Sequence, residues 1–195
     1  MPERLPLLPP DQLDEAQRAV YAAITGGRRA DGPRLFETTG VHGELLGPFA
    51  AMVAQPAVGQ PLQRLGEALR YETSLPPLTR EVVILSVAAH RRSEYEWYAH
   101  AAVARDMGMS DATLESVRTR ELPSELDDGT EAVWRLVALL LRQDPVDDDI
   151  YTAAQAVCGT AGVVEVVTLV GYYSLLAQLL DVFQLGLPDG CRPVF

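Results

Sequence analysis

The chain has 195 residues, and its 27 acidic and 16 basic side chains give a formal net charge of −11. A surface this acidic repels phosphate backbones and anionic lipid headgroups, so we expect neither a nucleic-acid nor a membrane partner. A hydrophobic share of 48% is that of a folded globular protein, and the length suits one domain.

Apolar residues recur at helical spacing almost throughout, and no run of strict alternation suggests a strand. The sequence therefore predicts an all-α, single-domain fold. The first helix is expected over residues 10–24, and residues 28–47 form an irregular stretch rich in glycine and charge that can order only against the rest of the fold or a neighbouring subunit. We divide the chain into an N-terminal helix with an irregular extension, residues 1–44, and a helical domain, residues 45–195.

The helices of this domain have recognisable starts. Thr79, Ser110 and Thr130 are expected to cap three of them, because a hydroxyl before a helix accepts a backbone N–H. Ser93 followed by Glu96 fits a capping box that starts another. The other expected helical ranges are residues 48–54, 58–71, 93–107, 148–159 and 161–185.

Cysteine usage and the N-terminus indicate the compartment. Cys158 and Cys191 form neither a C-x-x-C pair nor a metal-ligand cluster, and two thiols are too few for a disulfide framework. Residues 1–10 lack the basic stretch and apolar core of a signal peptide. The apolar stretch over residues 161–180 is interrupted by polar residues, which favours a core helix over a membrane span. We expect a cytoplasmic protein without a bound metal.

Functional side chains concentrate between residues 81 and 100. Glu96 and His100 are four residues apart on an expected helix and share a face, and Glu81 lies in the first turn of an otherwise apolar helix. Burial and mutual charge tune a carboxylate and an imidazole towards proton exchange near neutral pH. Such a set suits proton transfer next to a carbonyl, or protonation of the carbanion left by departing carbon dioxide. We predict Glu81, Glu96 and His100 as catalytic residues.

Each of these residues also has a structural interpretation. Glu96 could only complete the capping box, His100 could be a core histidine bonded to Glu96, and Glu81 could serve the helix dipole. Glu165 lies in an apolar run, where a buried carboxylate needs a partner, and a structural ion pair is expected for it. Spacing alone does not decide between structure and catalysis.

Candidate substrate-binding residues surround the catalytic set. An arginine here could hold a substrate carboxylate in bidentate fashion, although arginines at helix ends are commonly solvated. Neighbouring aromatic residues point in different directions around their helix, so one is expected in the core and another at a pocket. The predicted substrate-binding residues are Ser93, His90, Arg80, Arg91, Tyr95 and Trp97.

Three segments between residues 78 and 110 resemble the core of the carboxymuconolactone decarboxylase family, which shares its fold with the alkylhydroperoxidase D proteins. They are residues 78–85 (LTREVVIL), 93–100 (SEYEWYAH) and 104–110 (ARDMGMS). The likeness is strong over residues 45–120 and weaker towards the C-terminus. It implies a homotrimer or homohexamer whose active sites lie in helical pockets near subunit contacts.

The peroxidase branch of this fold carries a glutamate, a C-x-x-C pair and a histidine. Matched by the resemblance, Glu81 and His100 are kept, whereas Ser93 and Glu96 stand in place of the cysteines, so this chain resembles a branch that lacks the pair. Peroxide reduction there needs an attacking and a resolving thiol. The resemblance therefore implies a cofactor-independent lyase or isomerase that acts on a small carboxylated lactone or keto compound. The alternatives are a non-catalytic ligand-binding or assembly protein and, less favoured, a thiol peroxidase that uses Cys158.

Overall fold

The computed structural model describes residues 4–27 and 33–195, and in these residues the chain is helical. It forms a short 3-10 helix and eight α-helices, with an isolated bridge between Thr39 and Leu45 as the only strand-like pairing there. The elements are η1 (Pro10–Gln12), α1 (Glu15–Gly26), α2 (Pro48–Ala54), α3 (Pro56–Tyr71), α4 (Pro77–Arg91), α5 (Glu94–Asp106), α6 (Asp111–Thr119), α7 (Asp128–Arg142) and α8 (Asp148–Phe183). The predicted all-α fold is confirmed.

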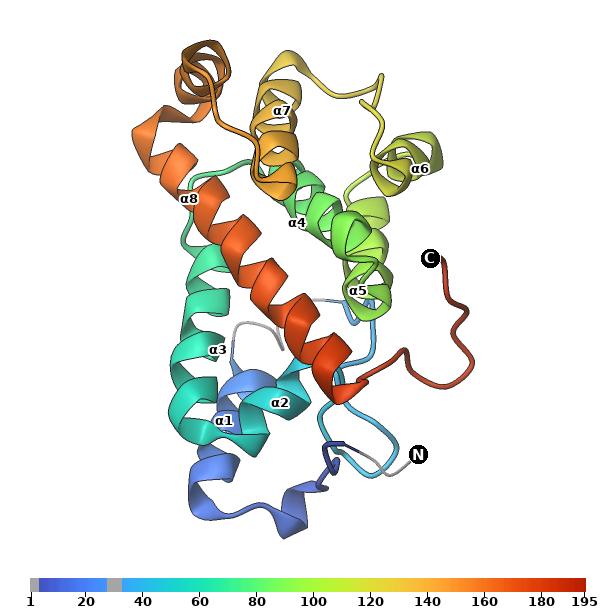
Figure 1. Ribbon diagram of the computed structural model, residues 1–195. Helices are drawn as coiled ribbons and strands as arrows, with labels where there is room; N and C mark the ends of the chain where they lie inside the picture. The colour runs from blue at the N-terminus through green and yellow to red at the C-terminus, as the bar shows by residue number, and fades with distance from the viewer. Residues whose placement is uncertain (1–3, 28–32) are drawn as a thin grey trace.

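Helix α4 is the centre of the fold. Its residues from Thr79 to Ala89 are all buried, and α5, α6, α7 and α8 pack against it. In Figure 1, α8 crosses the molecule diagonally, with α6 and α7 at one end and α1 and α2 at the other. The mostly apolar sequence of α4 from Val82 to Ala89, interrupted only by Ser86, follows from this position, because a helix covered on all sides has no solvent-exposed face.

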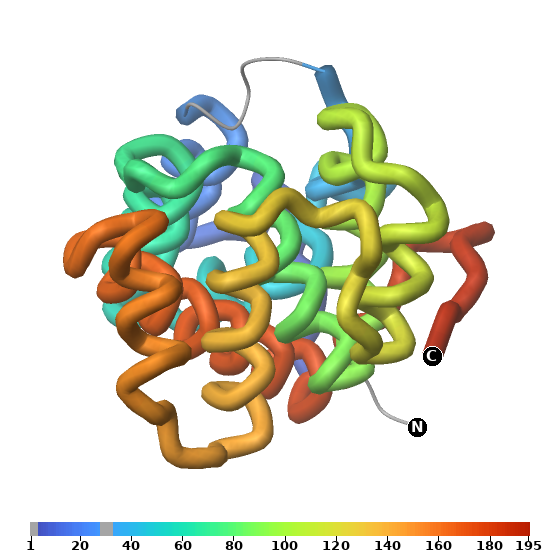
Figure 2. The backbone as a smooth tube through the Cα atoms, turned by 90° about the horizontal axis from the view of Figure 1, so that it is seen from above, coloured from blue at the N-terminus to red at the C-terminus, as the bar shows by residue number. Residues whose placement is uncertain are grey.

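Two apolar clusters use different faces of α4. One contains Val83 and Leu136 and joins α4 to α7, α8 and the N-terminal helices. The other contains Val82 and Trp97, and the ring of Phe195 packs edge-on against Trp97 at 5.4 Å. The C-terminal segment thus returns to cover the second cluster, and Figure 2 shows it beside the yellow-green part of the chain.

Several helices begin at other residues than predicted. Helix α4 starts at Pro77, so Thr79 lies inside it and its hydroxyl pairs with that of Thr130 at 2.8 Å. Proline suits the first turn because the N–H that it lacks would have no helical partner there. Asp127 caps α7 by accepting the Thr130 N–H at 2.9 Å, so Thr130 is not the cap. Ser110 caps α6 as predicted.

The first helix is shorter than predicted. Residues 10–12 form η1, and α1 begins at Glu15 behind a capping box between Asp14 and Gln17. The carboxylate of Asp14 accepts the Gln17 backbone N–H at 2.8 Å, and the Gln17 side chain accepts the Asp14 N–H at 3.0 Å. This reciprocal pair fixes the start more strongly than the proline at residue 10.

Helix α8 joins the last two predicted helices. They meet at Gly159, whose φ of 67° departs from helical geometry and kinks α8 there. Among the described helices, α8 is long and apolar enough to cross a membrane by length and composition. Yet Val166 and Leu169 are buried and α8 packs against α4 and α7, as a core helix does.

Glu165 secures the loop that precedes α4. Its half-buried carboxylate accepts the backbone N–H groups of Ser74 at 3.0 Å and Leu75 at 3.2 Å. The predicted ion pair is wrong for the described part of the chain, because these amide groups satisfy the carboxylate without a cation.

Candidate active site

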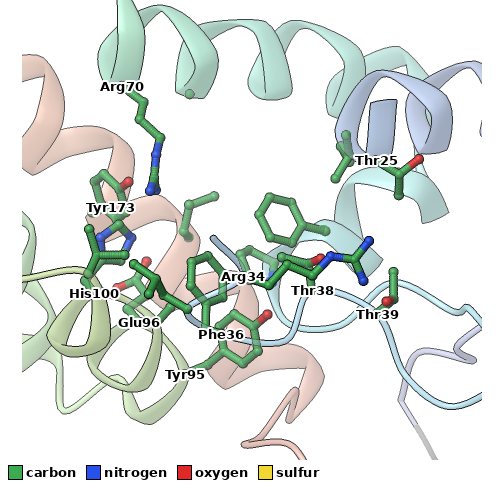
Figure 3. A pocket seen from close by; sticks show the side chains of 18 of the residues that line it. Thr25, Arg34, Phe36, Thr38, Thr39, Arg70, Tyr95, Glu96, His100 and Tyr173 are labelled. Atoms are coloured by element: carbon green, nitrogen blue, oxygen red, sulfur yellow. The ribbon is translucent and has the colours of Figure 1, made fainter. Parts of the chain in front are cut away.

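A cavity of about 180 Å³ lies between α3, α5, α8 and the segment of residues 33–39. Figure 3 shows His100 and Glu96 beside Arg70 and Tyr173 at one side of it, with Phe36 nearby. An engineered cavity of about 150 Å³ holds benzene, so this space suits a small molecule. The cavity therefore has the size of a site for a compact organic substrate.

His100 and Glu81 form a buried pair at this cavity. The Nδ1 atom of His100 lies 2.7 Å from Oε2 of Glu81, and Glu81 is fully buried behind the imidazole. Burial raises the pKa of Glu81, but His100 and the charges of Arg70 and Arg80 more than offset this and leave the pKa below its ordinary value. An ionised Glu81 accepts the Nδ1–H of His100, which leaves Nε2 as the reactive nitrogen.

Glu96 is a second buried acid, and its pKa is shifted in the opposite direction from that of Glu81. It lines the cavity at 2% exposure, and neither oxygen has a hydrogen-bond partner among the described residues. Burial raises its pKa well above the ordinary value, and the nearby Ser93 hydroxyl and Arg91 guanidinium oppose this without reversing it. This environment therefore favours the protonated form of Glu96, which can donate a proton.

The predicted capping box between Ser93 and Glu96 is not formed. Ser93 occupies the position before α5, but its hydroxyl bonds no backbone N–H of that helix. The hydroxyl approaches Glu96 without a hydrogen bond of normal geometry. The Glu96 side chain turns to the cavity instead of back to the helix start, which removes the structural explanation for this acid.

Arg70 was missed by the sequence analysis. It extends from α3 towards His100 and Tyr173 (Figure 3), and it forms no ion pair with a carboxylate of the described residues. The buried stripe of α3 gives the signal that would have found it. Arg70 follows buried Gly66 by four residues, so it shares that face and points inwards.

Tyr173 is the other residue that was missed. Its ring packs edge-on against His100, with centroids 5.1 Å apart. Burial, together with the charge of Glu81, raises its pKa, so the phenol keeps its proton. Tyr173 therefore adds a neutral wall and a hydroxyl donor to the cavity.

The segment of residues 33–39 closes the cavity from the N-terminal side. The Tyr95 hydroxyl donates to the Glu37 carbonyl at 2.8 Å, and the Glu37 N–H donates to the Tyr98 hydroxyl at 3.2 Å. The irregular stretch predicted over residues 28–47 thus orders against α5 in its described part, while residues 28–32 lie outside the described residues. Tyr95 lines the cavity and also ties this wall in place.

The arginines predicted to hold a substrate carboxylate do not line this cavity. Arg80 is buried with its Nε 3.9 Å from Oε1 of Glu81, and it stabilises the buried acid. Arg91 is exposed and lines a surface groove between the start of α5 and the end of α8, together with Ser93. Arg70 occupies the position that these residues were expected to fill.

The remaining predicted residues are also placed elsewhere. Trp97 packs in the second apolar cluster, away from the cavity. His90 lines a separate cavity between α4, α6 and α7. Successive residues on a helix point about 100° apart, so neighbours of a catalytic residue need not share its pocket.

Comparison with known proteins identifies a similar family. Residues 56–141 match the carboxymuconolactone decarboxylase family. The resemblance predicted from residues 78–110 is thereby confirmed, for a chain without a C-x-x-C pair. No curated protein matches the chain significantly in sequence.

Solved structures share the fold across nearly the whole chain. An alkylhydroperoxidase D core, an uncharacterised peroxidase-related protein from Ralstonia eutropha JMP134, matches with a TM-score of 0.75 at 14% identity over 97% of this chain and 94% of that one. A peroxidase-related protein from Silicibacter sp. TM1040 matches with 0.73 at 13% identity over 96% and 93%. A cysteine-to-alanine variant of the debrominase Bmp8, in complex with 2,3,4-tribromopyrrole, matches with 0.71 at 9% identity over 95% and 91%. At identities this low, the TM-scores show a common fold and nothing further.

Proposed function

We propose that the chain is a cofactor-independent acid–base enzyme that removes carbon dioxide from a small carboxylated lactone or keto compound. One observation carries the proposal: two buried carboxyl groups, Glu81 and Glu96, have pKa values shifted in opposite directions around His100 at one cavity. Environments that separate the pKa values of two acids in this way assign one as the charged partner and the other as the proton donor.

The step balances without a further reactant other than water. The bond between the carboxylate carbon and its neighbour breaks, carbon dioxide leaves, and the electron pair remains on the substrate as an enolate. His100, as an imidazolium whose Nδ1–H is held by Glu81, donates its Nε2–H to the enolate oxygen. Glu96 then gives its proton to carbon and regains one from water when the product leaves.

Arg70 supports an anionic substrate. Its guanidinium lies on the His100 side of the cavity in a strongly acidic protein, where it attracts a negative charge to this space. During the reaction the charge passes from the carboxylate to the enolate. A cation beside His100 stabilises that charge where it develops.

The alternatives have less support. An assembly protein without chemistry could bury these acids with no cavity beside them, whereas Glu96 and His100 both line one. For a thiol peroxidase, Cys158 would have to act from α8, where burial raises its pKa and its thiol donates to the Ala154 carbonyl at 3.1 Å. Neither Cys158 nor Cys191 lines the cavity.

Carbon dioxide release tests the proposal. The wild-type protein and its E96Q, H100A and D106N variants are assayed on a panel of carboxylated lactones and β-keto acids. Loss of a general acid costs about 10²- to 10⁴-fold in rate, so we expect this loss in E96Q, with a comparable fall in H100A. Asp106 is an exposed acid at the end of the same helix, and D106N should keep full activity. Release that survives in both E96Q and H100A would exclude this site, and exchange of solvent deuterium into a substrate without release would indicate an isomerase.

A further inference from the structure

A second cavity, of about 270 Å³, lies between α4, α6 and α7. Figure 1 places α6 and α7 at the end of the molecule opposite α1 and α2. His90, which lines it, follows Glu81 by nine residues on α4, or roughly 13 Å along a helix that rises about 1.5 Å per residue. This cavity is therefore separate from the candidate active site, although one helix contributes to both.

One part of this cavity is apolar. Val117 of α6 and Trp134 and Leu141 of α7 line it, and Trp134 is only half-buried. A large aromatic side chain that keeps an accessible surface in a hollow offers a flat wall to a planar ligand. The volume exceeds the roughly 150 Å³ that holds benzene, so a two-ring compound fits.

The other part is basic. His90, Arg120 and Arg142 line it, and none of the residues that line it is acidic, in a chain whose net charge is −11. His90 and Arg142 lie in the last turns of α4 and α7, where positive charge complements a helix dipole. The dipoles explain a basic residue at each helix end, but they do not explain why three such residues surround one apolar hollow.

Arg120 is the residue without a counter-charge. Arg142 donates to Asp144 at 2.7 Å, whereas Arg120 forms no ion pair with any described residue. Burial, with the charges of Arg120 and Arg91, lowers the pKa of His90. His90 is thus a neutral hydrogen-bond donor beside one free guanidinium, which matches a single negative charge better than a doubly charged phosphate.

We propose that this cavity binds a small planar apolar carboxylate, whose ring packs against Trp134 and whose carboxylate pairs with Arg120. This site does not depend on the proposed reaction. It gives His90 a ligand-binding role outside the active site, and unlike the first cavity, which Glu96 lines, it has no acidic residue in its lining.

The test titrates the ¹⁵N-labelled protein with 1-naphthoate and follows the indole N–H signals. Trp134 lines the cavity, whereas Trp97 is buried against Phe195 and serves as the internal control. We expect a saturable shift of the Trp134 signal alone. 1-Naphthalenemethanol, which lacks the charge, should bind at least about tenfold more weakly, which corresponds to about 1.4 kcal/mol.

Two matched variants complete the test. R120Q should weaken naphthoate binding about tenfold or more, since a charge-assisted pair is lost. Glutamine tolerates the positive φ of 64° at this position, as Gln143 and Gln184 show at 60° and 55°. R118Q removes an arginine in the last turn of α6, two residues before Arg120, that is already paired with Glu115, and this variant should bind as the wild type does. An unshifted Trp134 signal, equal binding of the alcohol, or equal effects of R120Q and R118Q would each overturn the proposal.

Discussion

The imidazole of His100 and the carboxylate of Glu81 lie 2.7 Å apart, although they belong to different helices and are 19 residues apart in the chain. Helix α4 ends at Arg91 and α5 begins at Glu94, so a very short turn folds one helix against the other. Arg92 makes this turn with a left-handed φ of 52°. Two buried groups therefore depend on each other, because water reaches neither of them freely.

Replacing His100 by alanine should destabilise the fold as well as stop turnover. It removes the hydrogen-bond partner of a fully buried carboxylate, and the loss of one member of a buried pair costs about 3–5 kcal/mol. Urea denaturation followed by circular dichroism measures the change in the free energy of unfolding.

The double variant E81Q/H100A provides the control. A neutral glutamine needs no counter-charge, so the double variant should be more stable than H100A although it changes two residues. A loss below about 1 kcal/mol in H100A would show that Glu81 does not depend on the imidazole.

The second prediction concerns pH and Glu96. Because the folded-state pKa of Glu96 is raised above its ordinary value of 4.5, its contribution to stability is fully present below pH 4.5 and is lost as the pH rises towards the folded pKa. The glutamine of E96Q does not titrate, so the variant has no such loss of stability. Its stability relative to the wild type should therefore increase above pH 4.5 by at most about 1.4 kcal/mol per pH unit.

Denaturation of both proteins at each pH from about 4 to about 8 measures this difference across the range where a raised carboxyl pKa acts. Glu81 has a lowered pKa, so its contribution to stability is lost as the pH falls below 4.5. Both proteins contain Glu81, so this contribution cancels when their stabilities are subtracted. D106N, which alters an exposed acid, should show a nearly constant difference over the same range. A constant difference for E96Q as well would mean that folding does not raise the pKa of Glu96.

The sequence predicted the candidate catalytic residues but not their pairing. Helical spacing placed Glu96 and His100 on one face, and both line the cavity as a result. The hydrogen bond of His100 instead joins Glu81 across two helices, which depends on how α4 packs on α5. The capping-box pattern suggested the wrong partner for Glu96, because a buried position beside the cavity determines its orientation more than the helix start does.

The residues that other segments contribute to the cavity could not be predicted from local sequence patterns. Arg70 comes from α3, outside the segment that carries the family motif, and it meets His100 only once α3 and α5 are placed by the core. The wall of residues 33–39 has no helical periodicity, and its position depends on the bonds between Glu37 and the tyrosines of α5. Contacts of this kind arise from tertiary packing, and helix propensity and residue spacing do not predict them.

Arg70 gives the third prediction. If it attracts the anionic substrate, R70Q should raise KM by about 10- to 100-fold, as expected for one or two lost charge-assisted hydrogen bonds. R70K should be intermediate, because an amine keeps the charge but not the bidentate geometry. R64Q removes an exposed arginine of the same helix and should leave KM unchanged. Equal KM values for R70Q and R64Q would remove Arg70 from the site.

The last prediction compares two glycines in helices. A Cβ atom on Gly59 of α3 would lie 1.9 Å from the backbone oxygen of Met52 in α2, so G59A must separate two helices that meet at this point. Overpacking of this kind costs about 1–3 kcal/mol, and more where backbone rather than a side chain must move. Gly171 lies on the exposed face of α8 with nothing near its missing Cβ, and alanine there should add about 0.5–1 kcal/mol by restricting the unfolded chain. Denaturation midpoints should therefore move in opposite directions for the two variants. If G59A were as stable as G171A, α2 and α3 would not be held in close contact, and the N-terminal support of the cavity would have to be placed differently.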